Sequence, residues 1–277
     1  MSSRCNICVD PNCNGKFSCS CETCDKRDLC YRMLRPTIRI TTKCTQSCKH
    51  CCFSCSPSRN DFMTIEKARE INKFLINNNI EYTNIMGGEF FTHPDWFNII
   101  TTLCSSINLV RIVTNGDWVG IEDKKIKLLS KELPIYFAIS KDKWHTNKNV
   151  EAARDFCLDN DILHKVATKD QVKAESIVPI GRSEFEYNFY SMFGRYCTKP
   201  DRKYEFLIDE QGVIHKCPMG IWQYADVLDF LGGGFDERFK EFTSVFYSEL
   251  ILNCATCIRA WQLNTKRGNI PNNKRSL

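Results

Sequence analysis

Three cysteines lie close together near the start of the chain, Cys44, Cys48 and Cys51, at spacings of four and three residues. They follow a strand-like run at 37–41, which places them on one tight loop. Three thiolates on such a loop can hold three corners of an iron–sulfur cube, because these clusters are bound through cysteine sulfur. The fourth iron is then free to bind a small molecule. Taken alone, the same thiols can also chelate zinc.

A second chemical motif, Gly87-Gly88-Glu89, comes after the next strand-like run. Glycine lets the backbone approach a ligand without a Cβ in the way. The adjacent carboxylate can accept hydrogen bonds from an ammonium group. By itself a glycine pair is more often an ordinary turn. Its place one strand and one helix after the cysteine loop is what favours a functional interpretation.

These two motifs together resemble the signature of the radical S-adenosylmethionine (SAM) superfamily. His50 stands where that family usually has an aromatic residue, and Phe90 replaces the usual proline after the glutamate. The resemblance implies that Cys44, Cys48 and Cys51 hold a [4Fe–4S] cluster whose open iron binds SAM. It also implies a set of SAM contacts at strand ends: Gly87, Gly88, Glu89, Asn115, Ser140 and, more weakly, Arg182.

The resemblance further implies a radical SAM oxidoreductase. An electron donor such as flavodoxin or ferredoxin reduces the cluster, SAM is cleaved to a 5′-deoxyadenosyl radical, and the radical abstracts hydrogen from the substrate. In cofactor enzymes of this kind the protein supplies binding and positioning. The sequence identifies no catalytic acid or base.

The composition agrees with an enzyme-sized chain. It has 277 residues, 43% of them hydrophobic, which allows a sizeable core, and a net charge of +5. There is no apolar run long enough for a membrane span and no secretory signal, so we expect a cytoplasmic protein without a membrane partner. In a reducing compartment the 18 cysteines indicate metal or cluster sites rather than disulfides. The mildly basic net charge does not by itself indicate nucleic-acid binding.

Strand-like and helix-like segments alternate through the middle of the chain. The strand-like runs are 37–41, 81–86, 108–114, 134–140, 162–168 and 176–180. Helices are expected to open at Thr64 and Pro94 and to cover 121–131 and 149–160. This order predicts an α/β fold, a partial (β/α)6 TIM-like barrel over 36–190. Ligands of such folds gather at the carboxyl ends of the strands, where each motif lies.

A cysteine-rich segment at 1–35 precedes this core. Its seven cysteines are Cys5, Cys8, Cys13, Cys19, Cys21, Cys24 and Cys30. Apolar residues are few, so bound metal is what could fold it. Spacing alone does not separate zinc from a third iron–sulfur cluster. Cys52 and Cys55 extend the central loop; we interpret them as packing residues, with a role as extra ligands left open.

The remaining region, 191–277, has a different pattern. Two strand-like runs flank Gly212, which predicts a hairpin, and Phe235, Phe239 and Phe242 follow at helical spacing. Four cysteines surround these elements: Cys197, Cys217, Cys254 and Cys257. The pattern resembles the twitch domain, the shorter relative of the SPASM domain, and implies an auxiliary [4Fe–4S] cluster. Structural zinc is the alternative. The basic end of the chain is interpreted as a solvated tail.

The substrate is the least determined part of the prediction. Twitch and SPASM relatives often modify peptides or proteins, so we expect oxidation or cross-linking of such a substrate. A small-molecule dehydrogenase of the same mechanism is the alternative. A third hypothesis, of another class, is a zinc-binding module that binds nucleic acid through a degenerate barrel.

Overall fold

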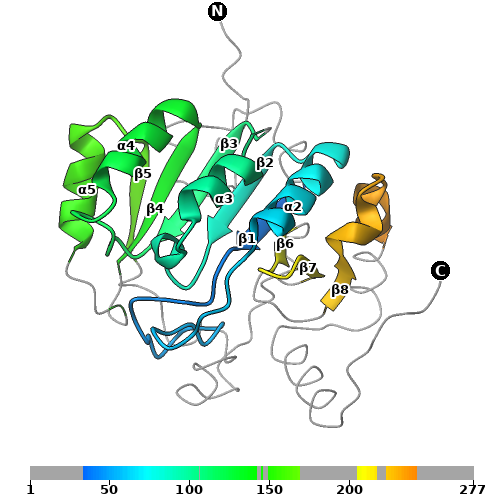
Figure 1. The fold of residues 1–277 in the computed structure, drawn as a ribbon, viewed down its shortest axis with the longest axis horizontal. Coiled ribbons are helices and arrows are strands. Elements are labelled where there is room, and N and C mark those ends of the chain that lie inside the picture. The colour runs from blue at the N-terminus through cyan, green and yellow to red at the C-terminus, as the bar shows by residue number, and fades with distance from the viewer. Residues whose placement is uncertain are drawn as a thin grey trace, which may run out of the picture.

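The computed structural model describes residues 34–105, 107–141, 145, 149–168, 205–216 and 223–241. Its centre is an eight-stranded sheet with the strand order β5-β4-β3-β2-β1-β6-β7-β8. The strands from β5 to β6 run parallel, and β7 and β8 are antiparallel additions at one edge. This open sheet is the predicted mixed α/β architecture, a partial barrel that does not close (Figure 1).

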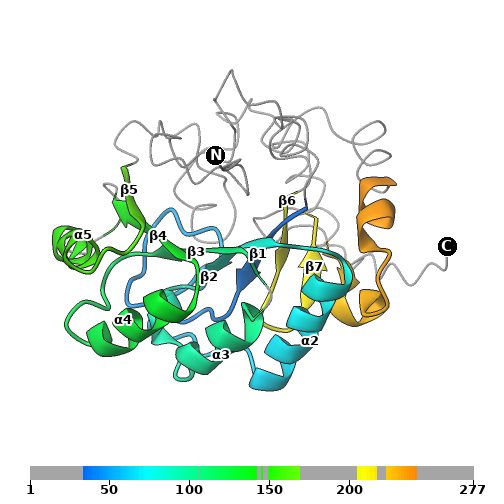
Figure 2. The ribbon, with the colours of Figure 1, turned by 90° about the horizontal axis from the view of Figure 1, so that it is seen from above.

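The first half of the sheet is built of strand–helix units. The strands are β1 (Arg35–Arg39), β2 (Tyr82–Met86), β3 (Leu109–Thr114), β4 (Ile135–Lys141) and β5 (His164–Thr168). The helices between them are α2 (Ile65–Asn77), α3 (Trp96–Leu103), α4 (Asp123–Glu132) and α5 (Val150–Asp159), and the short helix η1 (Phe90–Thr92) precedes α3. Figure 2 shows α2, α3 and α4 along one face of the sheet.

Helix α2 shows how local sequence fixes these elements. Thr64 caps it as predicted, and its side chain accepts a hydrogen bond from the Lys67 backbone N–H at 3.2 Å. Ala68, Ile71 and Phe74 fall on one face and are buried against the sheet. The next helix begins later than predicted: its first residue is Trp96, with Asp95 at the N-cap, rather than Pro94.

The predicted hairpin is present as β6 (Glu205–Ile208) and β7 (Val213–His215), followed by β8 (Gln223–Asp226) and η5 (Val227–Phe230). The sequence did not indicate that β6 would pair in parallel with β1 and continue the central sheet. Phe235 and Phe239 lie in a helical stretch at 235–241, and their buried rings stack 5.0 Å apart beside Phe206 of β6. The hairpin is therefore packed into the same core as the barrel strands.

An aromatic cluster fills the core beneath η1 and α3. It comprises Phe90, Phe91, Trp96, Trp118 and Phe137, with neighbouring ring centroids 4.8–6.1 Å apart. Phe90, the residue that replaces the family's proline, is completely buried in this cluster. Such rings stabilise the turn that leaves β2. Among the described elements, no helix combines the length and apolar character that crossing a membrane requires.

Candidate active site

A cavity of about 360 Å³ opens at the carboxyl edge of the parallel strands. The thiols of Cys44, Cys48 and Cys51 lie at one side of it, and β1 to β4 form its wall. The wall includes most of the residues that the sequence singled out, namely Gly87, Gly88, Asn115 and Ser140. Motifs separated by almost 100 residues therefore meet at one place, as the strand-end argument predicted.

The Gly-Gly-Glu turn, Gly87–Glu89, pairs directly with the cysteine loop, residues 43–55. The Gly88 N–H donates to the Thr41 carbonyl at 2.8 Å, and the Glu89 N–H donates to the Lys43 carbonyl at 2.9 Å. A Cβ on Gly88 would lie 2.2 Å from the Lys43 carbonyl oxygen, well inside van der Waals contact. Glycine is needed here because the two backbones approach so closely. This is a structural requirement in addition to any contact with a ligand.

Glu89 lies behind the cavity wall with 1% of its surface exposed. Its carboxylate accepts hydrogen bonds from the Thr114 hydroxyl at 2.6 Å and from the Asn115 backbone N–H at 2.7 Å. Burial raises the pKa of Glu89 to about 7, and these hydrogen bonds oppose that rise only in part. The carboxylate is thus oriented by neutral donors.

Asp117 fixes the next two residues of the cysteine loop, Thr45 and Gln46. Its carboxylate accepts hydrogen bonds from the Thr45 hydroxyl at 2.6 Å and from the Gln46 side-chain amide at 3.0 Å. The Asn115 side-chain amide also donates to the Thr45 hydroxyl, at 2.9 Å. The residues after β3 therefore hold the loop between the first two cysteines, and Asn115 links that loop to Glu89.

The thiols of the loop are close neighbours. Cys44 and Cys48 are 8% and 9% exposed, and the Cys51 thiol is hydrogen-bonded to the buried Cys55 thiol. Burial raises the pKa of Cys44 to about 12, and the nearby Glu89, Cys48 and Cys51 raise it further. Within the described ranges, no three His, Cys, Asp or Glu side chains are grouped closely enough to hold a single metal ion. All of these cysteines are present as free thiols.

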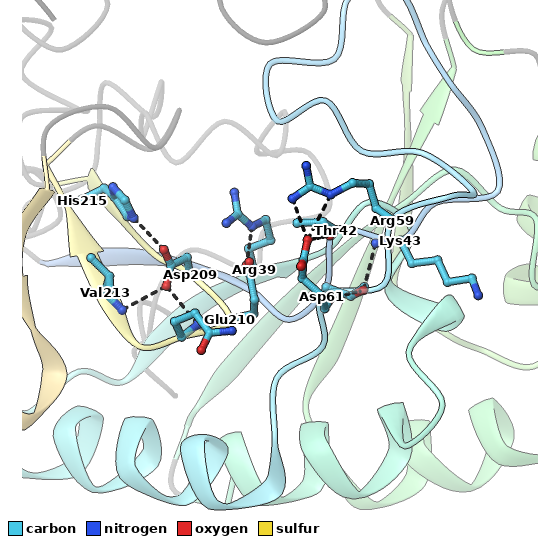
Figure 3. A network of polar contacts seen from close by, with 11 residues as sticks. Arg39, Thr42, Lys43, Arg59, Asp61, Asp209, Glu210, Val213 and His215 are labelled. Carbon is cyan, nitrogen blue, oxygen red and sulfur yellow. Dashed lines mark hydrogen bonds and ion pairs between the residues drawn. The ribbon is translucent and has the colours of Figure 1, made fainter. Parts of the chain in front are cut away.

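The opposite flank of the loop meets the β6–β7 turn through Arg39 (Figure 3). The Arg39 Nε donates to Glu210 at 2.7 Å, and both side chains are largely buried. The same guanidinium lies 5.0 Å from the Phe53 ring centroid in the cysteine loop. Next to this pair, Asp209 accepts a hydrogen bond from His215 at 2.8 Å. The hairpin is thereby tied to the loop that carries the cysteines.

Several predicted site residues lie outside the described residues. They are the cysteines of 1–35, Arg182, and the proposed auxiliary ligands Cys197, Cys217, Cys254 and Cys257. Of the described candidates, Ser140 belongs to β4 itself rather than to the loop after it. Cys52 and Cys55 line the cavity, whereas Cys104 and Cys157 are buried thiols in helical segments away from it.

The sequence interpretation missed part of the cavity wall. Asn84, Arg111, His145 and Glu205 also line it, and the His145 ring lies 4.9 Å from the His50 ring, edge to face. Asn84 and Arg111 are partly buried and alternate with the buried apolar residues Ile85 and Ile112 of their strands. That period of two could have identified them as inward-facing. Nothing near His145 in the sequence indicates its place.

The cavity fits an iron–sulfur cluster held by Cys44, Cys48 and Cys51. Three cysteines from one loop line the same cavity at the strand ends, and sulfur is the donor that such clusters take. The close backbone approach at Gly88 leaves the Cys44 side chain directly beside the Gly-Gly-Glu turn. The oriented carboxylate of Glu89 next to Asn115 supplies an acceptor for a cationic group.

Comparisons with known proteins agree with this geometry. Residues 38–154 match the family model described as Radical SAM superfamily. The chain is 25% identical over 182 residues to the antilisterial bacteriocin subtilosin biosynthesis protein AlbA of Bacillus subtilis (strain 168), covering 58% of this chain and 40% of that protein. It is 28% identical over 162 residues to the putative peptide biosynthesis protein YydG of the same organism, covering 53% and 50%. The chain thus spans about half or less of the length of these relatives.

Solved structures show the same fold at low identity. BtrN in complex with AdoMet and 2-DOIA superimposes with a TM-score of 0.53 and 12% identity, covering 76% of this chain and 87% of that chain. Native anSMEcpe with bound AdoMet gives a TM-score of 0.50 and 14% identity, covering 76% and 84%. The partial barrel is therefore the fold of these proteins.

Proposed function

We propose that this chain, whose residues 38–154 match the Radical SAM superfamily model, is a radical SAM enzyme that oxidises or cross-links a peptide or protein. One observation carries the proposal: the three cysteines and the glycines of the Gly-Gly-Glu turn, distant in sequence, line one cavity, and the turn is hydrogen-bonded to Thr41 and Lys43 just before the first cysteine. The names of the relatives AlbA and YydG, which concern bacteriocin and peptide biosynthesis, support a peptide substrate.

In this proposal Cys44, Cys48 and Cys51 hold a [4Fe–4S] cluster, and SAM binds against the Gly-Gly-Glu turn, Asn115 and Ser140. When bound and reduced by a donor such as flavodoxin or ferredoxin, the cluster supplies the electron for SAM cleavage to a 5′-deoxyadenosyl radical. The residues of the chain itself position SAM and exclude water from the reacting groups. Glu89, whose carboxylate is oriented by Thr114 and Asn115 behind the cavity wall at the strand edge, would accept hydrogen bonds from the ammonium group of SAM.

The cavity wall limits access of water to the reacting groups. Met86, the last residue of β2, and Val113, the residue before the last of β3, add apolar side chains to its lining. Apolar lining of this kind helps to shield a reactive intermediate from solvent. The proposed auxiliary cluster at Cys197, Cys217, Cys254 and Cys257 would accept the electron released by the substrate, which makes the net reaction an oxidation. Arg182 is retained as a further proposed SAM contact.

The decisive test is anaerobic reconstitution with iron and sulfide, followed by reductant and SAM. We expect about eight or more irons per chain, from two four-iron clusters, and 5′-deoxyadenosine as a product. Cys44→Ala should remove about four irons and abolish SAM cleavage. Cys104→Ala is the matched control, because Cys104 is equally buried but lies outside the cavity, and it should keep both.

A second variant separates the two proposed clusters. Cys254→Ala should retain SAM cleavage but lose the modified product, because only the auxiliary cluster is affected. Identical behaviour of Cys44→Ala and Cys254→Ala would contradict the division into two sites. Stoichiometric zinc together with no 5′-deoxyadenosine would refute the enzyme proposal and favour a zinc-binding module.

A further inference from the structure

The inner wall of the cavity carries a row of polar side chains in strand register. Thr37 of β1 pairs with Asn84 of β2, Asn84 pairs with Arg111 of β3, and Arg111 pairs with Tyr136 of β4. Paired residues of neighbouring strands present their side chains on the same face of a sheet. The first three line the cavity together with the cysteine thiols. The cysteine thiols therefore lie at one end of the cavity, and Thr37, Asn84 and Arg111 lie at the other.

Arg111 is the cationic member of the row, and it has no anionic partner among the residues that the structure describes. The side chain is half-buried, and its Nε is fully buried without a hydrogen-bond acceptor. The Tyr82 phenol is hydrogen-bonded to the Arg111 side chain, and the Arg111 charge also acts on the Tyr136 phenol. Glu205 of β6 lines the same cavity but forms no ion pair with Arg111 among the described residues. Across the described ranges, the ion pairs do not include Arg111. Arg39, on the same sheet, differs because it is paired with Glu210.

A partly desolvated guanidinium without a carboxylate is costly, because burial weakens its hydration and a neutral phenol replaces that hydration only in part. The cost is recovered when a ligand brings a carboxylate, since the planar fork of arginine binds both oxygens. Asn84 and Thr37 stand next to Arg111 in the row and add a donor and a hydroxyl for the same ligand. The site is therefore complementary to an acidic group.

We infer that Arg111 binds a side-chain carboxylate of the substrate, so that the preferred substrate is a peptide segment containing Asp or Glu. The inference rests on the proposed function, because it assigns the inner part of the same cavity. Arg111 precedes Thr114, the last residue of β3, by three residues, which places it roughly 10 Å below the strand edge. Glu89 and the cysteines lie at that edge. A ligand reaching Arg111 therefore extends past the proposed SAM position into the barrel.

The test compares two fluorescent nonapeptides that differ only at a central Glu or Gln, in a background of Ser, Gly and Ala. Binding to the full-length, anaerobically reconstituted protein is followed by fluorescence anisotropy. We expect the Glu peptide to bind about tenfold more tightly, the usual strength of one charged hydrogen-bonded contact. Arg111→Met should abolish the preference and Arg111→Lys should keep part of it. Arg154→Met, a change at an exposed arginine on α5, should leave it intact.

The methionine carboxylate of SAM is the other possible source of the anion. Equilibrium dialysis of SAM distinguishes the two, because Arg111→Met should leave SAM affinity unchanged. Equal binding of the two peptides to the unaltered protein would overturn the inference without any variant, as would a tenfold loss of SAM affinity in Arg111→Met. Formation of 5′-deoxyadenosine without peptide reports on the proposed function separately, so either proposal can fail while the other stands.

Discussion

Two carboxylates flank the cysteine loop, and their surroundings are opposite. Glu89, on the β2 side, is held by a hydroxyl and a backbone N–H, and burial raises its pKa to about 7. Asp209, on the β6 side, is also buried, but the hydrogen bond from His215 and the nearby charges of His215 and Arg39 outweigh burial and lower its pKa. One carboxylate lacks a cation and the other has cations supplied by the protein.

The difference indicates which flank serves structure and which serves a ligand. At the β6 side the charges are balanced within the chain, so the hairpin and the loop are fixed without further partners. At the β2 side the carboxylate is oriented but not neutralised, an arrangement that suits a ligand bearing an ammonium group. In the proposed complex, the ammonium group of SAM would neutralise the Glu89 carboxylate.

The largest expected effect comes from adding a side-chain atom at Gly88, where the backbones of the Gly-Gly-Glu turn and the cysteine loop lie in close contact. Gly88→Ala places a Cβ 2.2 Å from the Lys43 carbonyl oxygen, so the cysteine loop must move. We expect a loss of more than about 3 kcal/mol of stability and failure to retain iron, measured by thermal unfolding and iron content. Gly232→Ala is the control, since a Cβ there meets nothing within 4 Å. Normal iron content in Gly88→Ala would show that the turn and loop can separate.

A smaller effect is expected from the β6 side. Arg39→Met leaves the buried Glu210 carboxylate without its cation and should destabilise the protein by about 3 kcal/mol in chemical denaturation. The double variant Arg39→Met/Glu210→Met should recover most of this loss, because an apolar pair replaces the ion pair. If the single variant cost nothing, the pair would not be what ties the hairpin to the loop.

The two carboxylates should respond to neutralisation with opposite signs. The pKa of Glu89 lies above its ordinary 4.5, so its charged form costs stability as pH rises from about 4.5 through 7. Glu89→Gln should therefore stabilise the metal-free protein at pH 8 by about 2 kcal/mol, with the difference vanishing near pH 5. Its SAM affinity should fall nevertheless.

Asp209→Asn is the matched opposite. The pKa of Asp209 lies below its ordinary 3.8, so its charged form contributes stability at every pH above that value, and this stability is lost on acidification. Neutralising it should destabilise the protein at pH 8 by about 1 kcal/mol. Denaturant titrations of both variants at pH 5 and 8 test the contrast. Destabilisation of both at pH 8 would remove the distinction between the flanks.

Much of the barrel could be predicted because its information is local. Thr64 caps α2 through its own side chain, and the apolar face of that helix reads directly from the sequence. The strand ends were also predictable, since Gly87, Gly88 and Asn115 each follow an apolar run. These motifs lie close together because the carboxyl ends of parallel strands all lie at the same edge of the sheet, a general property of the fold.

What could not be predicted depends on pairing between distant segments. The parallel contact of β6 with β1 joins residues about 170 apart, and no periodicity encodes which strand lies next to which. The same pairing brings Glu210 to Arg39 and Glu205 to the cavity. Arg111 was missed for a different reason, because a charged residue inside an apolar strand is easily taken as solvent-facing when the inner side of the barrel is not considered.

The smallest expected effect concerns His93, which extends the contrast between the flanks. Its Nδ1 accepts from the Asp95 backbone N–H at 3.0 Å, so its Nε2 donates to the Met63 carbonyl at 2.9 Å. The ring is therefore held in its neutral form, and burial lowers its pKa below the ordinary 6.5. Protonation of Nδ1 would point a second ring N–H at the Asp95 backbone N–H, which is itself a donor. The stability that His93 contributes is complete above pH 6.5 and is lost as pH falls below it.

His93→Asn keeps an acceptor for the Asp95 N–H but cannot titrate. At pH 7.5 it should cost about 1 kcal/mol, the value of the lost contact with Met63, and this cost should shrink as the unaltered protein is acidified to pH 5. Unfolding free energies of both proteins across that range provide the test. A constant difference would mean that the pKa of His93 is the same in the folded and unfolded proteins, contrary to the lowered pKa inferred from its burial. If the stability difference between the two proteins grew on acidification, protonated His93 would be stabilised by the fold. The β2 side would then hold a cation of its own, as the β6 side does with Arg39, and the contrast between the two sides would be lost.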